Sequence, residues 1–276
     1  MTTVGSPART TVVRDTLAML RRDAIHSRRN PMLTASSVGT PVVMLLLFAG
    51  VFGDAMGRTV GDHGRYIDYL TPGIILMALG SSVSGTAITA CIDKTEGVVA
   101  RFKTMAIART SVLTGQVLGS TIRTVIGTVF VLGVAVLFGF RPQGFGLGWL
   151  LGLGLVAAVA FAWGWLGVGI GLYARTVAGA NSLGLLASLL TFISPAFVPT
   201  ESMPAGVRWF AQNQPYAPLI DTLRALLAGG PVDVGRAGLA LAWVILIGVA
   251  GYAWARHGYN ADPSASTGSA AALMSH

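Results

Sequence analysis

Lysine, which contacts phosphates in the loops of ATP-hydrolysing proteins, occurs only twice in this chain. Lys94 follows Asp93, and Lys103 follows Phe102. A phosphate-binding loop needs Gly-Lys followed by Ser or Thr, so that the backbone wraps the phosphates and the lysine reaches them. We therefore predict that this chain has no ATP site and no cofactor of its own. Any ATP that it uses is expected to be hydrolysed by a partner protein.

The sequence also shows no arrangement of residues that is typical of nucleophilic catalysis or metal binding. Cys91 is the only cysteine, which excludes an intrachain disulfide. The histidines show no metal-ligand spacing, and we interpret each of them as a solvated loop residue. The sequence predicts neither catalytic residues nor a metal site, so the chain is not expected to be an enzyme. The histidines are His26, His63, His257 and His276.

The composition is that of a membrane protein. Of 276 residues, 53% are hydrophobic and 11% are charged, and the mean hydropathy is +0.67. Soluble domains carry about 25% charged residues, so the composition argues against a soluble enzyme. Runs of roughly 20 apolar residues can cross a bilayer core of about 30 Å as helices. We predict an all-α integral membrane protein with six transmembrane helices, at residues 32–53, 69–92, 111–139, 146–173, 178–199 and 236–257.

Acidic residues are absent from the interior of these six stretches. Asp54, Asp68 and Asp93 lie at their ends, where water and lipid headgroups solvate a carboxylate. A carrier driven by protons or sodium ions usually places Asp or Glu within its spans, as a relay or an ion ligand. The pattern therefore argues against an ion-coupled secondary carrier.

Lysine and arginine concentrate on one side of the predicted spans. The N-terminal arm and the second connection carry most of them, whereas acids balance the arginines of the opposite loops. Because cytoplasmic loops carry the excess of positive charge, both termini are predicted to be cytoplasmic. This charge therefore indicates orientation in the membrane, and no nucleic-acid partner is expected.

Three regions follow from this pattern. Residues 1–30 form a cytoplasmic arm, residues 31–258 the transmembrane domain, and residues 259–276 a small polar tail that we expect to be disordered. In the arm, Val13, Leu17, Leu20 and Ala24 fall on one helical face among arginines. The arm is either an amphipathic helix lying on an anionic membrane surface or a solvated charged helix.

The connection between the second and third spans is richer in charge than a hairpin requires. Val98, Phe102 and Met105 have helical spacing and form an apolar ridge, which Arg101 and Lys103 flank. Such a ridge can dock into a groove of a partner protein. The alternative is a helix that lies on the bilayer surface.

The segment from Pro199 to Pro231 is too polar to span a membrane and too apolar for open water. Helices inserted halfway into the membrane are tolerated only when they pack against protein, which suggests re-entrant helices before the last span. Glu201 and Arg208 either form an ion pair at the outer rim or are each solvated. The positions that we assign to a re-entrant gate are Pro199, Glu201, Pro204, Arg208, Pro215 and Arg224.

Two polar residues fall within predicted spans. Arg123 either extends to the inner headgroups or faces an internal cavity or the cytoplasmic connection. Asn181 is predicted to donate a hydrogen bond between helices near the cytoplasmic end of the fifth span.

Short motifs along the chain carry a resemblance to a known family. They stand in the same order as in that family and cover most of residues 12–257. The chain resembles the type-2 ABC exporter permeases, and among them the daunorubicin-resistance subfamily of actinobacteria. It departs from the family at Ala106, where a proline is frequent. The motifs include Arg29-Asn30-Pro31, Tyr69-Leu70-Thr71-Pro72-Gly73-Ile74, Glu96-Gly97, Arg101-Phe102-Lys103, Ile107-Ala108-Arg109, Gly115-Gln116-Val117-Leu118, Phe197-Val198-Pro199, Gln214-Pro215 and Leu223-Arg224-Ala225-Leu226-Leu227.

The resemblance implies an architecture and an assembly. It implies six spans, an amphipathic N-terminal connecting helix, a cytoplasmic coupling helix between the second and third spans, and re-entrant helices before the sixth. It also implies a homodimer in the plasma membrane that binds two copies of a cytoplasmic ATPase subunit, which holds ATP and Mg. The residues assigned to coupling are Glu96, Val98, Arg101, Phe102, Lys103, Met105 and Arg109.

The expected function is ATP-driven export of a hydrophobic or amphipathic drug or antibiotic. Export of a lipid or glycolipid is the alternative within the same mechanism, and a membrane subunit that anchors or regulates a complex is the alternative from another class. Membrane lipids are expected partners in each case. The predicted substrate path is lined by apolar side chains and hydroxyls, including Phe48, Met77, Ser81, Ser84, Phe192 and Ser194.

Overall fold

A computed structural model describes residues 31–57, 66–96, 109–141, 146–194, 196 and 204–261. Every element in these ranges is an α-helix. The N-terminal arm, most of the connection between the second and third predicted spans, and residues 262–276 of the predicted C-terminal tail lie outside the described residues. Residues 259–261, which we predicted to begin a disordered tail, belong instead to the last helix. The helices are α2 (Pro31–Gly57), α3 (Tyr66–Thr95), α5 (Arg109–Leu137), α6 (Leu147–Tyr173), α7 (Val177–Phe192), α8 (Ala205–Asn213), α9 (Tyr216–Ala228) and α10 (Val234–Ala261).

Among the described helices, four are long and apolar enough to cross a membrane: α3, the part of α5 from Leu113 to Leu137, α6 and α10. The described part of the chain is thus all-α and has helices that can span a membrane, as predicted for an integral membrane protein. Helices α2 and α7 contain shorter apolar stretches, at Gly39–Val51 and Val177–Phe192. The 16 residues of α7 span about 24 Å, which is less than a typical hydrocarbon core. Six spans therefore remain a prediction.

Helix α7 ends seven residues earlier than the apolar pattern predicted. After its last residue the hydrogen bonds shorten from four-residue to three-residue spacing, since the backbone N–H of Ser194 donates to the carbonyl oxygen of Thr191. The next residue in the sequence is Pro195, which has no N–H to continue the helix and disfavours helical geometry in the residue before it. The apolar sequence therefore continues past the end of the helix, but the helical hydrogen bonds cannot continue through the proline.

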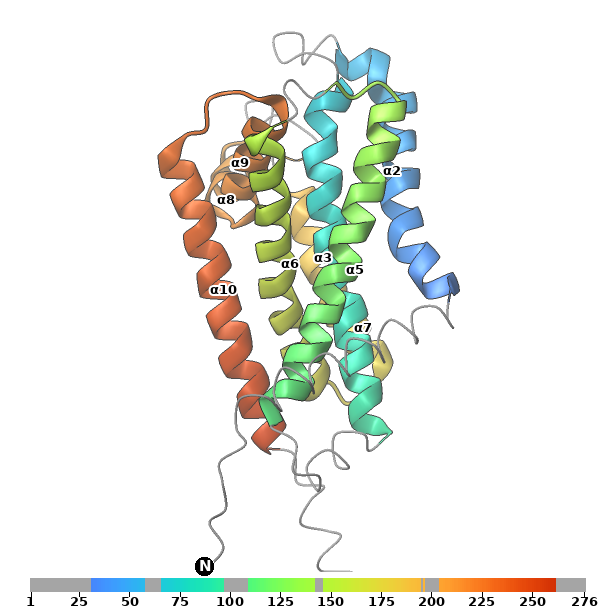
Figure 1. The fold of residues 1–276 in the computed structure, drawn as a ribbon, viewed down its shortest axis with the longest axis vertical. Helices are drawn as coiled ribbons and strands as arrows, with labels where there is room; N and C mark the ends of the chain where they lie inside the picture. Colours follow the sequence, from blue (N-terminus) through green and yellow to red (C-terminus); the bar gives the residue numbers. More distant parts are fainter. Residues whose placement is uncertain are drawn as a thin grey trace, which may run out of the picture.

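The long helices form one bundle with α3 at its centre. Helices α2, α5, α6, α7 and α9 all pack against α3, and α10 packs against α6 on the other side (Figure 1). Helix α2 begins near mid-height of the bundle and runs upward in this view, whereas α10 runs downward and ends at the bottom.

Glycine residues allow α7 and α6 to pack closely against α3. A Cβ atom on Gly184 of α7 would lie 2.4 Å from the Cα atom of Ser84 on α3. A Cβ atom on Gly171 of α6 would lie 2.4 Å from the carbonyl oxygen of Ala87, also on α3. Distances this short exclude any side chain, so glycine at both positions lets the backbones approach.

The outer surface of the bundle is apolar. On α5, Ile122, Ile126 and Phe130 follow one another at helical spacing and are all exposed. On α10, Ile245 and Val249 are exposed in the same way. A soluble protein would bury these side chains, whereas hydrocarbon chains of lipid cover them in a membrane protein.

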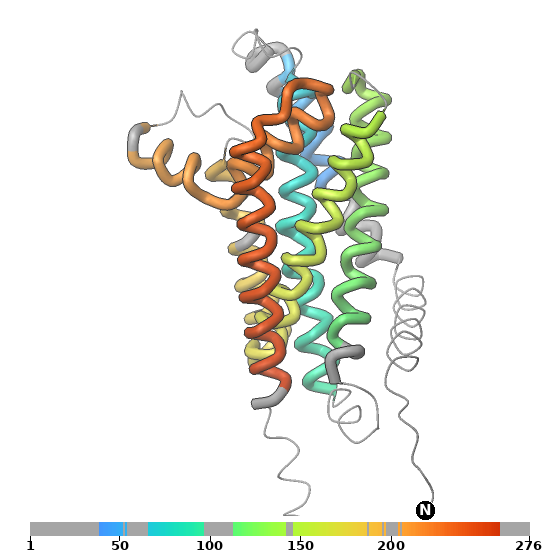
Figure 2. The backbone as a smooth tube through the Cα atoms, turned by 60° about the vertical axis from the view of Figure 1, so that its left-hand side comes forward, coloured from blue at the N-terminus to red at the C-terminus, as the bar shows by residue number. Residues whose placement is uncertain are grey.

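Helices α8 and α9 lie near the upper end of the bundle, and α8 projects sideways from it (Figure 2). Helix α9 packs against α3, α6 and α10, and its residues Tyr216, Leu219 and Ile220 are buried. Gly229 ends α9 in the left-handed conformation, with φ 69°, which glycine adopts without strain. Helix α8 carries the exposed Trp209, an amphipathic ring suited to a membrane interface.

Candidate functional site

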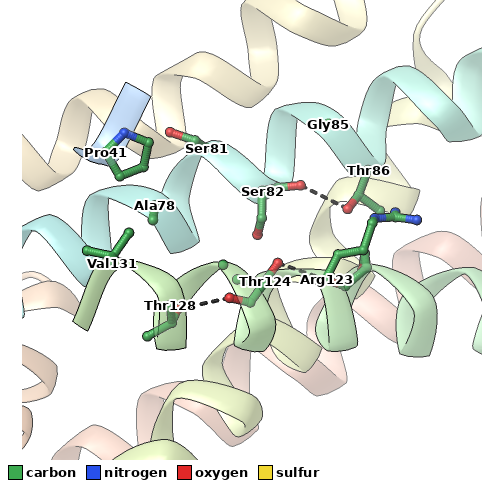
Figure 3. Close-up of a pocket in the computed structure, with 12 residues that line it drawn as sticks. Pro41, Ala78, Ser81, Ser82, Gly85, Thr86, Arg123, Thr124, Thr128 and Val131 are labelled. Atoms are coloured by element: carbon green, nitrogen blue, oxygen red, sulfur yellow. Dashed lines mark hydrogen bonds between the residues drawn. The ribbon is translucent and has the colours of Figure 1, made fainter. Parts of the chain in front are cut away.

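A small cavity of about 110 Å³ lies between α2, α3 and α5. Half of the residues that line it carry hydroxyl groups, and one, Arg123, is charged (Figure 3). We call this cavity the hydroxyl groove. Its lining residues are Pro41 of α2, Ala78, Ser81, Ser82, Gly85 and Thr86 of α3, and Ser120, Arg123, Thr124, Gly127, Thr128 and Val131 of α5.

The hydroxyl groups of the groove are satisfied within their own helices. Thr86 donates to the carbonyl oxygen of Ser82 at 2.8 Å, Thr124 to that of Ser120 at 2.8 Å, and Thr128 to that of Thr124 at 2.9 Å. Such bonds stabilise a hydroxyl in apolar surroundings and leave lone pairs on its oxygen. The wall therefore presents mainly hydrogen-bond acceptors.

Arg123 supplies the positive charge of the groove. It lies ten residues from Leu113 and fourteen from Leu137, near the middle of the apolar part of α5. Its side chain is partly buried and extends toward Thr86 on α3 (Figure 3). Of the two alternatives that the sequence left open, the structure places Arg123 at a cavity.

The residues predicted to line a substrate path lie at several places in the bundle. Ser81 lines the hydroxyl groove. Met77 and Ser84 are buried, and Ser84 lies on the side of α3 that faces α7. Ser194 is buried, and its hydroxyl donates to the carbonyl oxygen of Thr191.

The two phenylalanines of the predicted path lie apart from the groove lining as well. Phe192 is exposed at the end of α7, and Phe48 is only partly buried on α2. Among the path residues, the groove itself thus holds only Ser81. The path as a whole stays a prediction.

Ser84 forms the contact predicted for Asn181. The Ser84 hydroxyl donates to Oδ1 of Asn181 at 2.6 Å, which joins α3 to α7. The predicted interhelical hydrogen bond is present, with Asn181 as acceptor instead of donor.

Most of the residues assigned to coupling lie outside the described residues. These are Val98, Arg101, Phe102, Lys103 and Met105. Glu96 ends the turn after α3, where its N–H donates to the carbonyl oxygen of Ile92 at 2.9 Å, and Arg109 begins α5. The segment that we predict to couple therefore connects the two helices that form most of the hydroxyl groove.

Lys94 has a structural role that the sequence did not indicate. Its Nζ atom donates to the carbonyl oxygen of Leu172 at 2.6 Å and to that of Ala174 at 3.5 Å. A helix leaves its last carbonyl groups without partners, and a lysine can satisfy them. The last turn of α3 thereby holds the C-terminal end of α6, next to the predicted coupling segment.

Arg224, predicted at the gate, contacts α3. Its guanidinium lies 4.0 Å from the ring centroid of Tyr69 and donates to the Tyr69 carbonyl oxygen at 3.4 Å. Asp221 lies 3.7 Å from Arg224 and forms a second ion pair with Arg236 of α10. These contacts join α9 to α3 and to α10.

The other predicted gate residues that the structure describes lie on α8 or directly before α8 and α9. Pro204 and Pro215 are the capping residues before α8 and α9, where the missing N–H of proline costs nothing. Arg208 lies on α8, and its backbone N–H donates to the carbonyl oxygen of Pro204 at 2.8 Å. Pro199 and Glu201 lie outside the described residues, so the predicted Glu201–Arg208 pair stays a prediction.

A buried contact between α6 and α9 was not predicted. The indole N–H of Trp163 donates to the hydroxyl of Tyr216 at 3.1 Å, and the rings are perpendicular with centroids 5.8 Å apart. The side-chain amide of Gln214 donates to the carbonyl oxygen of Ile193 at 2.9 Å. Together these bonds hold the start of α9 against α6 and the end of α7.

A bundle of long apolar helices is the architecture of a helical integral membrane protein. The ABC-2 type transporter family matches residues 14–228. Because this match covers well over half of the sequence, the chain belongs to the ABC-2 type transporter family.

Curated relatives of the chain are drug-resistance permeases by name. The chain is 25% identical over 223 residues to the probable doxorubicin resistance ABC transporter permease protein DrrC of Mycobacterium tuberculosis, covering 80% of this chain and 79% of the relative. It is 28% identical over 234 residues to the daunorubicin resistance ABC transporter permease protein DrrB1 of Streptomyces coeruleorubidus, covering 83% and 81%. The resemblance drawn from the motifs is confirmed.

Proposed function

We propose that this chain is the transmembrane subunit of an ATP-driven exporter that moves a hydrophobic or amphipathic drug outward across the plasma membrane. The observation that carries the proposal is the family match over residues 14–228, together with relatives that are named as doxorubicin and daunorubicin resistance permeases. The sequence offers no phosphate-binding loop, which supports a separate ATPase subunit.

The proposed mechanism uses the connection between α3 and α5. ATP closes two partner ATPase subunits, which bind ATP and Mg, and the ridge of Val98, Phe102 and Met105 transmits their motion. Glu96 and Arg109 flank this segment at the ends of α3 and α5. Because both helices line the hydroxyl groove, a displacement of the segment changes the groove directly.

The proposed assembly is a homodimer of this chain with two ATPase subunits. Both termini face the cytoplasm, which follows from the distribution of lysine and arginine. The α8–α9 helices then lie at the outer side, where Arg224 and Asp221 hold α9 to α3 and α10. Substrate leaves past these helices.

The experiment is co-purification followed by an ATPase assay. The chain is expressed together with the ATPase encoded beside it, purified in mild detergent, and assayed with and without a panel of hydrophobic drugs and lipids. We expect an ATPase in equal ratio to the chain and a change of its rate with at least one of these compounds. A chain that purifies alone, without an associated ATPase, would contradict the proposal and favour an anchoring role.

A further inference from the structure

The hydroxyl groove lies beside an apolar stripe on the outside of the bundle. Ile126 is 64% exposed and Phe130 is 57% exposed, and both are on α5, which also supplies Arg123 and Thr124 to the groove. On α2, which also borders the groove, Val43 and Leu47 are exposed. A recess lined by hydroxyl groups and an arginine therefore meets an apolar outer surface along α5, in a part of the chain that we place within the membrane.

The size of the groove limits what it can hold. Pockets that enclose a drug-sized molecule have volumes of about 300–1,000 Å³. The groove has about 110 Å³, which is room for several water molecules or for a small polar group. It can therefore take the head of an amphipathic molecule while the remainder lies against the exposed stripe.

The chemistry of the lining selects the kind of head. Arg123 carries a permanent positive charge and five N–H donors in a planar arrangement that matches carboxylate and phosphate oxygens. Five donors are enough to bind a ligand while the side chain also keeps a contact within the protein. The residues that line the groove include no Asp or Glu. An ammonium head would be repelled by the guanidinium, whereas an oxyanion would be attracted.

We propose that the hydroxyl groove binds the oxyanion head, phosphate or carboxylate, of an amphipathic molecule whose apolar part lies on the α5 stripe. Hydroxyl groups on the same head donate to the oxygens of Thr86, Thr124 and Thr128, whose own hydrogens are engaged with backbone carbonyls. This inference rests on the proposed function where it makes the ligand a substrate. The binding itself requires no ATPase.

The test measures binding to the full-length chain in nanodiscs of phosphatidylcholine. The probe is phosphatidylglycerol with a fluorescent acyl chain, and energy transfer from tryptophan reports its contact with the protein. Phosphatidylcholine with the same labelled chain is the headgroup control. A labelled fatty acid carries a carboxylate instead of a phosphate, so it separates a phospholipid ligand from other acidic amphiphiles.

We expect phosphatidylglycerol to bind more tightly than phosphatidylcholine, and Arg123→Gln to weaken phosphatidylglycerol binding about tenfold or more, since hydrogen bonds to charged groups are the strong ones. The matched control is Arg256→Gln, which removes the same charge from an exposed site on α10. Arg123→Lys keeps the charge and should restore part of the binding. Fatty-acid binding that depends on Arg123 would widen the ligand class to carboxylates, and its absence would restrict the class to phosphates.

Equal binding of both phospholipids would overturn the proposal, as would phosphatidylglycerol binding that Arg123→Gln leaves unchanged. If Arg123→Gln does not fold, Thr124→Val with Thr128→Val removes two of the three acceptor oxygens with little change of side-chain shape and should still weaken binding. Failure of drug-stimulated ATPase activity with intact binding would contradict the exporter and not the site. Drug-stimulated ATPase activity together with equal binding of both phospholipids would contradict the oxyanion site and still support the exporter.

Discussion

The Nζ atom of Lys94, in the last turn of α3, lies 2.6 Å from the carbonyl oxygen of Leu172, in the last turn of α6. This bond joins the ends of two helices that are 78 residues apart in the sequence. It also fixes the point at which the chain leaves α3 for the segment that we propose to couple. Any force on that segment acts first on the end of α3 and, through Lys94, on the end of α6.

Lys94→Met is expected to destabilise the protein. The substitution leaves the carbonyl oxygens of Leu172 and Ala174 without their charged donor, at a cost of about 1.5–3 kcal/mol. Thermal unfolding in detergent measures the loss as a lower midpoint. Lys103→Met removes the only other lysine and is the charge-matched control, which should change the midpoint little. Equal shifts for the two variants would argue against the bond.

Phe102→Asp is expected to abolish drug stimulation of the partner ATPase and export, while the permease still folds and inserts. The reason is that a carboxylate on the apolar ridge cannot be buried in a groove of the partner. Ala100→Asp places the same charge on the opposite face of the predicted helix and serves as the control. Rates of ATP hydrolysis and drug efflux from cells are the measurements. Intact export by Phe102→Asp would show that the ridge does not couple.

Gly184→Ala should separate α3 from α7, because the new methyl group would lie 2.4 Å from the Cα atom of Ser84. Overpacking of this kind costs about 1–3 kcal/mol. Gly133→Ala on α5 adds the same methyl group where nothing lies within 4 Å, and should be neutral or slightly stabilising. Unfolding midpoints of both variants decide between a close contact and a general intolerance of helical glycine substitutions.

Arg224→Gln and Tyr69→Leu are expected to destabilise the docking of α9, each by about 0.5–2 kcal/mol. Because the guanidinium and the ring lie 4.0 Å apart, the two losses should not add in the double variant. Stability of the four proteins in a double-mutant cycle measures the coupling. Full additivity would mean that the two residues act separately.

Length, hydropathy and short motifs were sufficient to predict the class of protein and the positions of the long helices. The C-terminal end of α7 was predicted wrongly, because the apolar run continues past Ser194 while the backbone cannot form helical hydrogen bonds through the proline that follows. Long-range side-chain partners were beyond a single sequence. Trp163 and Tyr216 are separated by 53 residues, and nothing in their local sequence marks them as a pair.

The hydroxyl groove was partly visible in the sequence. Ser120, Thr124 and Thr128 recur at intervals of four around Arg123, which places them along one side of a helix. Ser82 and Thr86 repeat the interval on α3. That the two rows face each other depends on how α3 and α5 pack, which their separate patterns do not determine.

The groove and the lipid-facing stripe occupy adjacent sides of a single helix. Arg123 and Ile126 are three residues apart, so their directions differ by about 60° around the axis of α5. Rotation of α5 by a sixth of a turn would exchange the guanidinium for a branched hydrocarbon at the same location. A rotating α5 would thus switch the recess from attracting an anion to rejecting it, without any change in helix length or in the helical hydrogen bonds.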